Sequence, residues 1–229
     1  MKRILTLAAA AALACGSTSS NNAVVSRNHS GTGTNTLTVK GDIAAAMSTG
    51  TTPAPQTTFS VTVTDGAGAT VGGATVTVLN PSVPDGVVNL AQIVAGAGPY
   101  VGTVASFATG DFTLNVVKGA DSVQGVVVGG PGMHTINAPA VNATVPANQD
   151  LAVSWTTPAV AKQVKVFTRD MTFSGPDLGA YTILAAQNPV RAGQRVRVER
   201  TNEVEAAGGL LGSRLIVTYL AAVDPFTVQ

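Results

Sequence analysis

Residues 59–78 read FSVTVTDGAGATVGGATVTV and carry the strongest indication of secondary structure in the chain. Every second residue from Phe59 to Val63 is apolar, and small polar residues lie between them. Residues 74–78 alternate in the same way, and the intervening DGAG of residues 65–68 is a turn signal. Strict alternation over this length is typical of half-buried β-strands, so the stretch predicts two strands joined by a turn.

The same residues carry a family resemblance. VTVTDG at residues 61–66, followed by VGGATVTV at residues 71–78, resembles the hairpin of bacterial immunoglobulin-like and carboxypeptidase-regulatory-like domains. The resemblance implies a β-sandwich whose glycine-rich connection tolerates positive φ. We expect Asp65 to serve the turn, because the further acidic or amide residues that a calcium loop requires are missing.

Short alternating segments continue on both sides of this stretch. Turn signals separate them, a spacing that predicts an antiparallel sandwich. The expected fold class is therefore all-β: two tandem antiparallel β-sandwich, immunoglobulin-like domains at residues 36–137 and 138–229, after a signal peptide and a flexible tether. The further predicted strands are 36–39, 100–107, 112–117, 123–128, 151–156, 162–168, 180–183, 195–200 and 214–219.

The second predicted domain has its own signature. LAVSWTTP at residues 151–158 resembles the early strands of fibronectin type III and related immunoglobulin-like sandwiches. Trp155 shares one face of that strand with Leu151 and Val153. The resemblance implies that Trp155 is the aromatic anchor of the second core.

The N-terminus predicts export. Met1–Arg3 is cationic, and residues 4–14 form an apolar run too short for a membrane span but suited to a signal peptide, which we place at residues 1–14. The ALAC at residues 12–15 resembles the lipobox of bacterial lipoproteins. The resemblance implies that Cys15, the one cysteine, is acylated and ties the chain to membrane lipid in the cell envelope. Gly16 then favours the outer membrane.

A conventional signal cleaved after Ala14 is the alternative, because Ala12 stands where a lipobox usually has a larger aliphatic residue. In either case, residues 15–35 are rich in Ser, Thr, Asn and Gly. Such a segment buries too little apolar surface to offset the entropy of ordering, so we expect a flexible tether.

Composition excludes several classes of protein. Only 11% of the 229 residues are charged and the formal net charge is +1, so no strong field favours a nucleic-acid partner. One cysteine excludes an internal disulfide, and two histidines exclude a zinc site made of imidazoles alone. We therefore expect no cofactor and no metal site.

Catalytic motifs are missing from the sequence. There is neither a nucleophile elbow nor a phosphate-binding glycine loop. His134 is the one histidine in a predicted folded region and lacks a motif for its partners. Asp170 and Asp177 flank a Gly-Pro turn and are expected to serve that turn. Paired carboxylates remain open from spacing alone, but we predict no catalytic residue and no enzyme.

Four arginines lie close together in the second domain. A solvated strand face is one interpretation, and a binding stripe for an anionic sugar or a lipid headgroup is another. Neighbouring acids, Glu199, Glu203 and Glu205, could neutralise such a stripe. The four arginines are Arg191, Arg195, Arg197 and Arg200.

Three functions fit these observations. The favoured one is a membrane-anchored, non-catalytic envelope lipoprotein that presents two sandwiches for structural or adhesive contact with an unidentified envelope or extracellular protein or polysaccharide. A carbohydrate-binding module would need exposed rings, for which the candidates are Tyr100, Phe173 and Tyr219. A small secreted hydrolase would need a catalytic constellation that the sequence does not show. The residues that contact a ligand cannot be assigned from these patterns.

Overall fold

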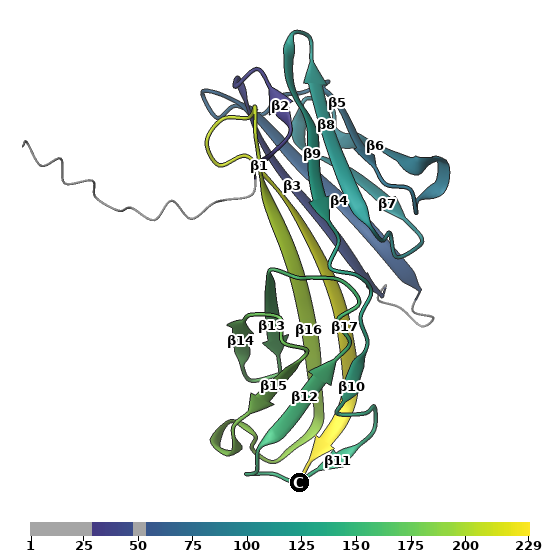
Figure 1. The fold of residues 1–229 in the computed structure, drawn as a ribbon, viewed down its shortest axis with the longest axis vertical. Coiled ribbons are helices and arrows are strands. Elements are labelled where there is room, and N and C mark those ends of the chain that lie inside the picture. Colours follow the sequence, from purple (N-terminus) through teal and green to yellow (C-terminus); the bar gives the residue numbers. More distant parts are fainter. Residues whose placement is uncertain (1–28, 48–53) are drawn as a thin grey trace, which may run out of the picture.

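The computed structural model describes residues 29–47 and 54–229. They form an elongated body of two β-sandwiches, one above the other, joined by a long hairpin (Figure 1). The predicted signal peptide, Cys15 and residues 16–28 of the predicted tether lie outside the described residues. Among the described residues, no helix has the length and apolar character needed to cross a membrane.

The upper sandwich is a single hydrogen-bonded path of strands that folds over itself. β6 pairs with β7 on one side and with β5 on the other, and so links the two layers. Phe59 and Phe112, which belong to opposite layers, pack edge to face with ring centroids 6.4 Å apart. In path order the strands are β3 (Leu37–Met47), β4 (Pro55–Asp65), β7 (Ala97–Val104), β6 (Val87–Val94), β5 (Thr75–Leu79), β8 (Asp111–Lys118), β9 (Asp121–Gly129) and β2 (Thr32–Gly33).

The lower sandwich has a long layer and a short one. The short layer has the order β10-β12-β15, with β10 at Ile136–Ala138, β12 at Leu151–Trp155 and β15 at Ala180–Ile183. Trp155 is 4% exposed in the core between the layers, which confirms its predicted role as an anchor. The long layer contains β14 (Thr172–Gly175), β13 (Gln163–Phe167), β16 (Arg191–Ala206) and β17 (Arg214–Val228). The remaining elements are β1 (His29–Ser30), β11 (Thr144–Val145) and the 3-10 turns Pro84–Gly86 and Ala185–Gln187.

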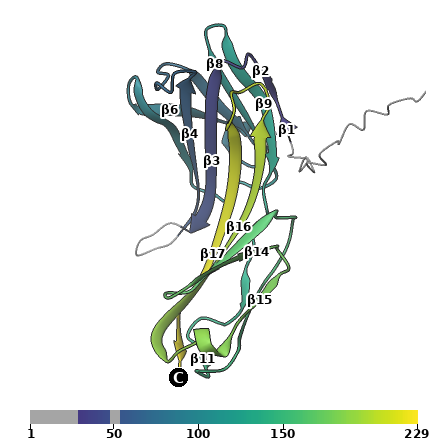
Figure 2. The ribbon, with the colours of Figure 1, turned by 90° about the vertical axis from the view of Figure 1, so that its left-hand side faces the viewer.

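The β16–β17 hairpin belongs to both sandwiches (Figure 2). Its lower half supplies Val196 and Val198 to the lower core, whereas its upper half supplies Leu215 and Val217 to the upper core. The cores therefore do not follow the predicted division between residues 137 and 138. The predicted boundary placed the whole hairpin in the second domain, whereas the hairpin contributes to both cores. The boundary itself remains a prediction.

The all-β fold class is confirmed, and the pairing adds parallel contacts to the expected antiparallel ones. β17 pairs in parallel with β3, so the C-terminal strand lies next to the first long strand of the chain. β1 with β16 and β11 with β17 are also parallel. β6 was not among the predicted strands, because its sequence VVNLAQIV does not alternate cleanly.

The predicted hairpin of residues 59–78 is wrong in its pairing. β4 pairs with β3 and β7, whereas β5 pairs with β6 and β8 in the opposite layer. One isolated bridge, Thr64 to Thr70, is all that remains of a hairpin. Both strands have an apolar face, and the glycine-rich connection lets these faces meet across the core rather than side by side. Asp65 serves the turn as predicted, because its carboxylate accepts hydrogen bonds from the amides of Ala67 and Ala69, both at 2.9 Å.

Residues 29–35, predicted as the end of the tether, are part of the upper sandwich. β2 pairs with β9, and β1 pairs with β16. The carbonyl of Gly208, in the turn between β16 and β17, accepts the amide of Asn35 at 2.7 Å. The expectation failed because backbone hydrogen bonds, which need no apolar side chains, order this polar segment.

Glycine permits this close approach. A Cβ atom at Gly208, where φ is +81°, would lie 1.9 Å from the backbone nitrogen of Gly33. Gly212, in the same turn, has φ of +88° but no atom within 4 Å of such a Cβ. The two positions therefore share backbone strain and differ in steric contact.

We predict that Gly208→Ala lowers the free energy of unfolding by about 1–3 kcal/mol more than Gly212→Ala, because only the first substitution forces a backbone apart. Denaturant unfolding of both variants measures the difference. Equal losses would show that residues 29–35 do not pack against the hairpin turn.

Candidate functional site

The junction between the sandwiches contains a buried ion pair. The side chain of Arg200 has no exposed surface and that of Asp177 is 4% exposed. The Arg200 Nε and Nη2 atoms donate to the Asp177 Oδ2 atom at 2.9 and 2.5 Å. The other carboxylate oxygen accepts the indole N–H of Trp155 at 2.8 Å. Asp177 thus joins the junction to the anchor of the lower core.

Arg200 also holds the chain segment that connects the sandwiches. Its guanidinium donates to the carbonyl of Pro131 through Nη1 and to that of Ala159 through Nη2. Two positions further along β16, the side-chain Nδ2 atom of Asn202 donates to the carbonyls of Gly129 and Val160, both at 2.9 Å. β9 ends at Gly129, so these contacts fix the exit of the chain from the upper sandwich against the shared hairpin.

Two corrections follow from this network. Arg200 was predicted as one of four arginines in a patch, but alternation places it on the core side with Val196 and Val198. Asp177 was predicted to serve a turn and instead neutralises a buried cation. Asp170 likewise binds Arg191, with Oδ1 at 2.5 Å from Nη2.

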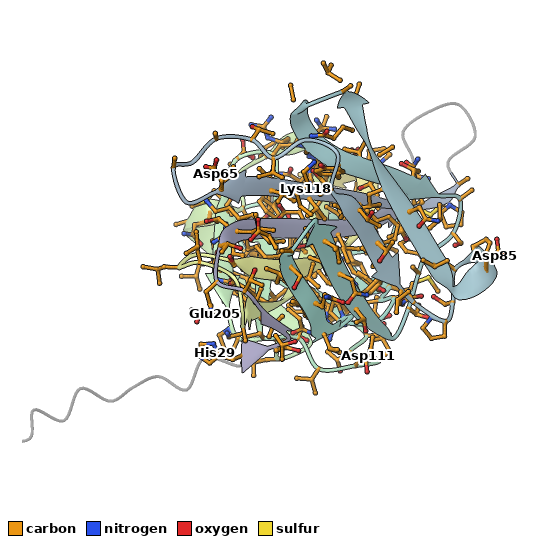
Figure 3. All side chains as sticks on the ribbon, turned by 90° about the horizontal axis from the view of Figure 1, so that it is seen from above. His29, Asp65, Asp85, Asp111, Lys118 and Glu205 are labelled. Carbon is orange, nitrogen blue, oxygen red and sulfur yellow. The ribbon has the colours of Figure 1, made fainter. Side chains whose placement is uncertain are left out.

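A cleft of about 770 Å³ opens beside the junction, lined by residues of both sandwiches. His29 and Asp111 line this cleft, and Figure 3 labels both of them together with Glu205, which lies beside His29. The His29 Nδ1 atom lies 3.4 Å from the Glu205 carboxylate, and the hydroxyl of Ser30 already donates to the carbonyl of Gly125. Among residues 29–47 and 54–229, no group of three or more His, Cys, Asp or Glu side chains could hold a metal ion.

His134 is a core histidine. It is 5% exposed, and its Nε2 atom lies 3.0 Å from the carbonyl oxygen of Val198. Burial lowers its pKa, and the positive charge of Arg200 acts in the same direction. In the described part of the chain its side-chain hydrogen bond goes to backbone rather than to a carboxylate or a hydroxyl nucleophile, so the geometry offers no triad.

The candidate sugar platforms are mostly buried. Tyr100 is 2% exposed, and its hydroxyl donates to the carbonyl of Val71 at 2.8 Å. Tyr219 is 1% exposed and donates to the carbonyl of Ala108, and burial raises its pKa. Phe173 packs on Tyr181 with ring centroids 4.8 Å apart. Two of the three candidate rings, Tyr100 and Tyr219, are therefore buried and cannot stack on a sugar.

The outward side of the lower long layer is basic. On β13 and β16, Lys165, Arg195 and Arg197 alternate with buried valines and so point away from the core. Arg197 lies over the ring of Phe167 at 5.3 Å from the centroid. We call this surface the arginine face and define it by Lys165, Arg169, Arg195 and Arg197, together with the acids Glu199 and Asp224.

The sequence predicted that four arginines lie near one another, but the prediction did not separate the outward-facing arginines from the buried Arg200. Arg195 and Arg197 lie on one face as expected, and Arg169 lies near them and binds Asp224 at 3.2 Å. Arg191 is separated from them by a bulge and pairs with the buried Val228, so it does not share their face. The signal for separating Arg200 was present, because it shares the parity of Val196 and Val198. Cys15, the predicted lipidation site, lies outside the described residues and stays a prediction.

No protein-family model matches the chain, and no curated protein matches it. Among solved structures, fibronectin(III)-like modules of Clostridium thermocellum CbhA are similar, at 13% identity over 84% of this chain and 94% of that chain, with a TM-score of 0.27. The IG1+IG2 structure of DIP-gamma is 10% identical over 85% of this chain and 98% of that chain, with a TM-score of 0.26. TM-scores this low do not support a function or a family for this chain. The assignment to the sandwich class rests on the strand pairing described above.

We predict that Arg200→Ala lowers the free energy of unfolding by about 3–5 kcal/mol, because it leaves the Asp177 carboxylate buried without its cation. Arg214→Ala is the matched control. It removes an exposed arginine 3.7 Å from Glu203 and should cost less than about 1 kcal/mol. Chemical denaturation compares the two, and equal losses would contradict a structural role for the buried pair.

We also predict a pH dependence from His134. Because its folded pKa is lowered, the unfolded chain takes up this proton first as the pH falls. The His134 contribution to stability is complete above about pH 6.5 and is lost as the pH falls from there toward the folded pKa. His134→Gln should therefore flatten the stability curve between about pH 7.5 and about pH 5. Urea unfolding across this range tests it, and an unchanged slope in His134→Gln would refute it.

Proposed function

We propose that the chain is a lipid-anchored, non-catalytic protein of the bacterial cell envelope, of the outer membrane in particular, that displays a rigid two-sandwich body for structural or adhesive contact. The observation that carries this proposal is that the junction between the sandwiches is fixed by buried contacts and that residues 29–35 pack beside it. The shared hairpin and the Arg200 network hold the two sandwiches as one body. Residues 29–35 belong to that body.

The anchor lies close to the body in sequence. Cys15 precedes His29 by 14 positions. A fully extended chain of that length spans at most about 50 Å, which sets the greatest distance between an acylated Cys15 and the upper sandwich. A rigid body on a short connection suits display at a membrane surface, where the loops and side faces meet partners.

The alternatives have less support. A sugar-binding module based on stacking needs exposed rings, and two of its three candidates are buried in the cores. A hydrolase needs converging catalytic groups, and His134 has a backbone partner in the described residues. The exposed polar faces of the two sandwiches are better suited to contact with a protein or with a charged partner.

The experiment that tests the anchor is fractionation of cells expressing the full chain, with mass spectrometry of the mature N-terminus. We predict that the wild-type chain is found in the membrane fraction with acyl mass on Cys15. Cys15→Ala should be released, because a lipid anchor depends on the thiol. Ser17→Ala keeps the cysteine and should remain membrane-bound.

A mature form that begins at Gly16 without acyl mass would contradict anchoring. Equal membrane retention of Cys15→Ala would do the same. Turnover of a substrate by the purified chain would instead contradict the non-catalytic role.

A further inference from the structure

The arginine face holds a large share of the positive charge of the protein. It carries four of the ten lysine and arginine residues in the described ranges, but two of the twelve acidic ones. Lys165, Arg195 and Arg197 project from two adjacent strands of one sheet, with Phe167 paired opposite Arg197. Positive charge is therefore concentrated on one side of the lower sandwich.

Two arginines of this face differ from the other four described arginines. Arg169, Arg191, Arg200 and Arg214 each pair with a carboxylate. Arg195 and Arg197 pair with none in residues 29–47 and 54–229. The neutralising role expected of two nearby acids is not seen, because Glu203 pairs with Arg214 and Glu205 lies beside His29.

The two side chains are held in place rather than freely extended. Their Nε atoms are buried, so the stems lie against the sheet. Arg197 is also held over the Phe167 ring at 5.3 Å. A guanidinium stacked in this way keeps an edge free for two parallel hydrogen bonds to a carboxylate or phosphate. Such preorganisation lowers the entropy cost of binding an anion.

The spacing suits a polymer with repeated anionic groups. Residues two apart on one strand face are separated by about 6.8 Å, so Arg195 and Arg197 form a short row along β16. Hydroxyl side chains lie on the neighbouring positions of the same layer, with Thr172 opposite Phe167 and Ser174 opposite Lys165. Charge complementarity and hydrogen-bonding groups therefore favour an extended polyhydroxylated polyanion.

Other partners fit less well. None of the exposed large apolar side chains of the described residues lies on β13, β14, β16 or β17, so the face has nothing to insert into a bilayer. Phe167 is covered by Arg197, so it is not a free platform for stacking a neutral sugar or a nucleic-acid base.

We propose that the arginine face binds an extended anionic polysaccharide, whose carboxylate or phosphate groups are held by Arg195 and Arg197. This inference rests on the proposed display function and names the chemistry of its partner. It uses a side face of the body, away from the junction cleft, and it requires no aromatic stacking.

Affinity electrophoresis of the full mature chain in detergent, in gels that contain polygalacturonate as the probe polyanion, tests the proposal. Gels that contain dextran provide the neutral comparison. Arg195→Gln/Arg197→Gln should weaken retardation by polygalacturonate about tenfold. Lys40→Gln/Lys118→Gln removes the same charge from the upper sandwich and should stay within about twofold of wild type. Arg195→Lys/Arg197→Lys keeps the charge and should bind with intermediate affinity, because it loses the bidentate geometry.

Competition identifies the source of the anion. We expect polygalacturonate oligomers to displace the bound polymer better than polyaspartate, or than micelles containing phosphatidylglycerol, at equal concentrations of anionic groups. Stronger displacement by the lipid or the peptide would overturn the assignment to a polysaccharide. An equal loss in the Lys40→Gln/Lys118→Gln control, or no binding beyond that to dextran, would overturn the site itself. The assay does not depend on acylation, so its failure is distinguishable from failure of the anchor.

Discussion

The buried guanidinium of Arg200 is the interaction on which the two-lobed architecture depends. A cation without solvent needs a counter-ion and hydrogen-bond acceptors. Arg200 finds them in Asp177 of the lower sandwich and in the carbonyls of Pro131 and Ala159 at the junction. The acceptors come from three separate segments. All of the hydrogen bonds of the guanidinium therefore form only when both sandwiches are folded and packed against the shared hairpin.

Strand positions could be predicted from the sequence, and strand partners could not. Alternation in residues 59–64 and 74–78 reports which side of each strand is buried, and both strands are present. Alternation says nothing about whether two apolar faces meet within one sheet or across the core, so the predicted hairpin became a crossing between layers. Residues 29–35 escaped prediction for a related reason, since backbone pairing with β9 orders them.

For the candidate site, too, the sequence predicts which way side chains face but not which residues they contact. That Arg195 and Arg197 face outward follows from the parity of β16, and the same parity places Arg200 inside. What the sequence lacks is the identity of the partner across space. Asp177 lies 23 residues before Arg200, in the turn after β14, and only the folded chain brings the two together. Residue type alone also did not predict that Tyr100 and Tyr219 are buried. Their hydroxyls donate to backbone carbonyls inside the core.

Sharing two long strands has a consequence for stability as well as for shape. β16 and β17 pair along nearly their whole length, so loss of the lower sandwich would expose the lower halves of strands whose upper halves complete the first core. Cooperative units follow such continuous pairing, and a chain linked in this way favours unfolding as one unit over two independent transitions. The same continuity keeps the arginine face in a fixed orientation relative to residues 29–35, where the connection to Cys15 begins. A partner that docks on that face therefore meets a surface already held in place.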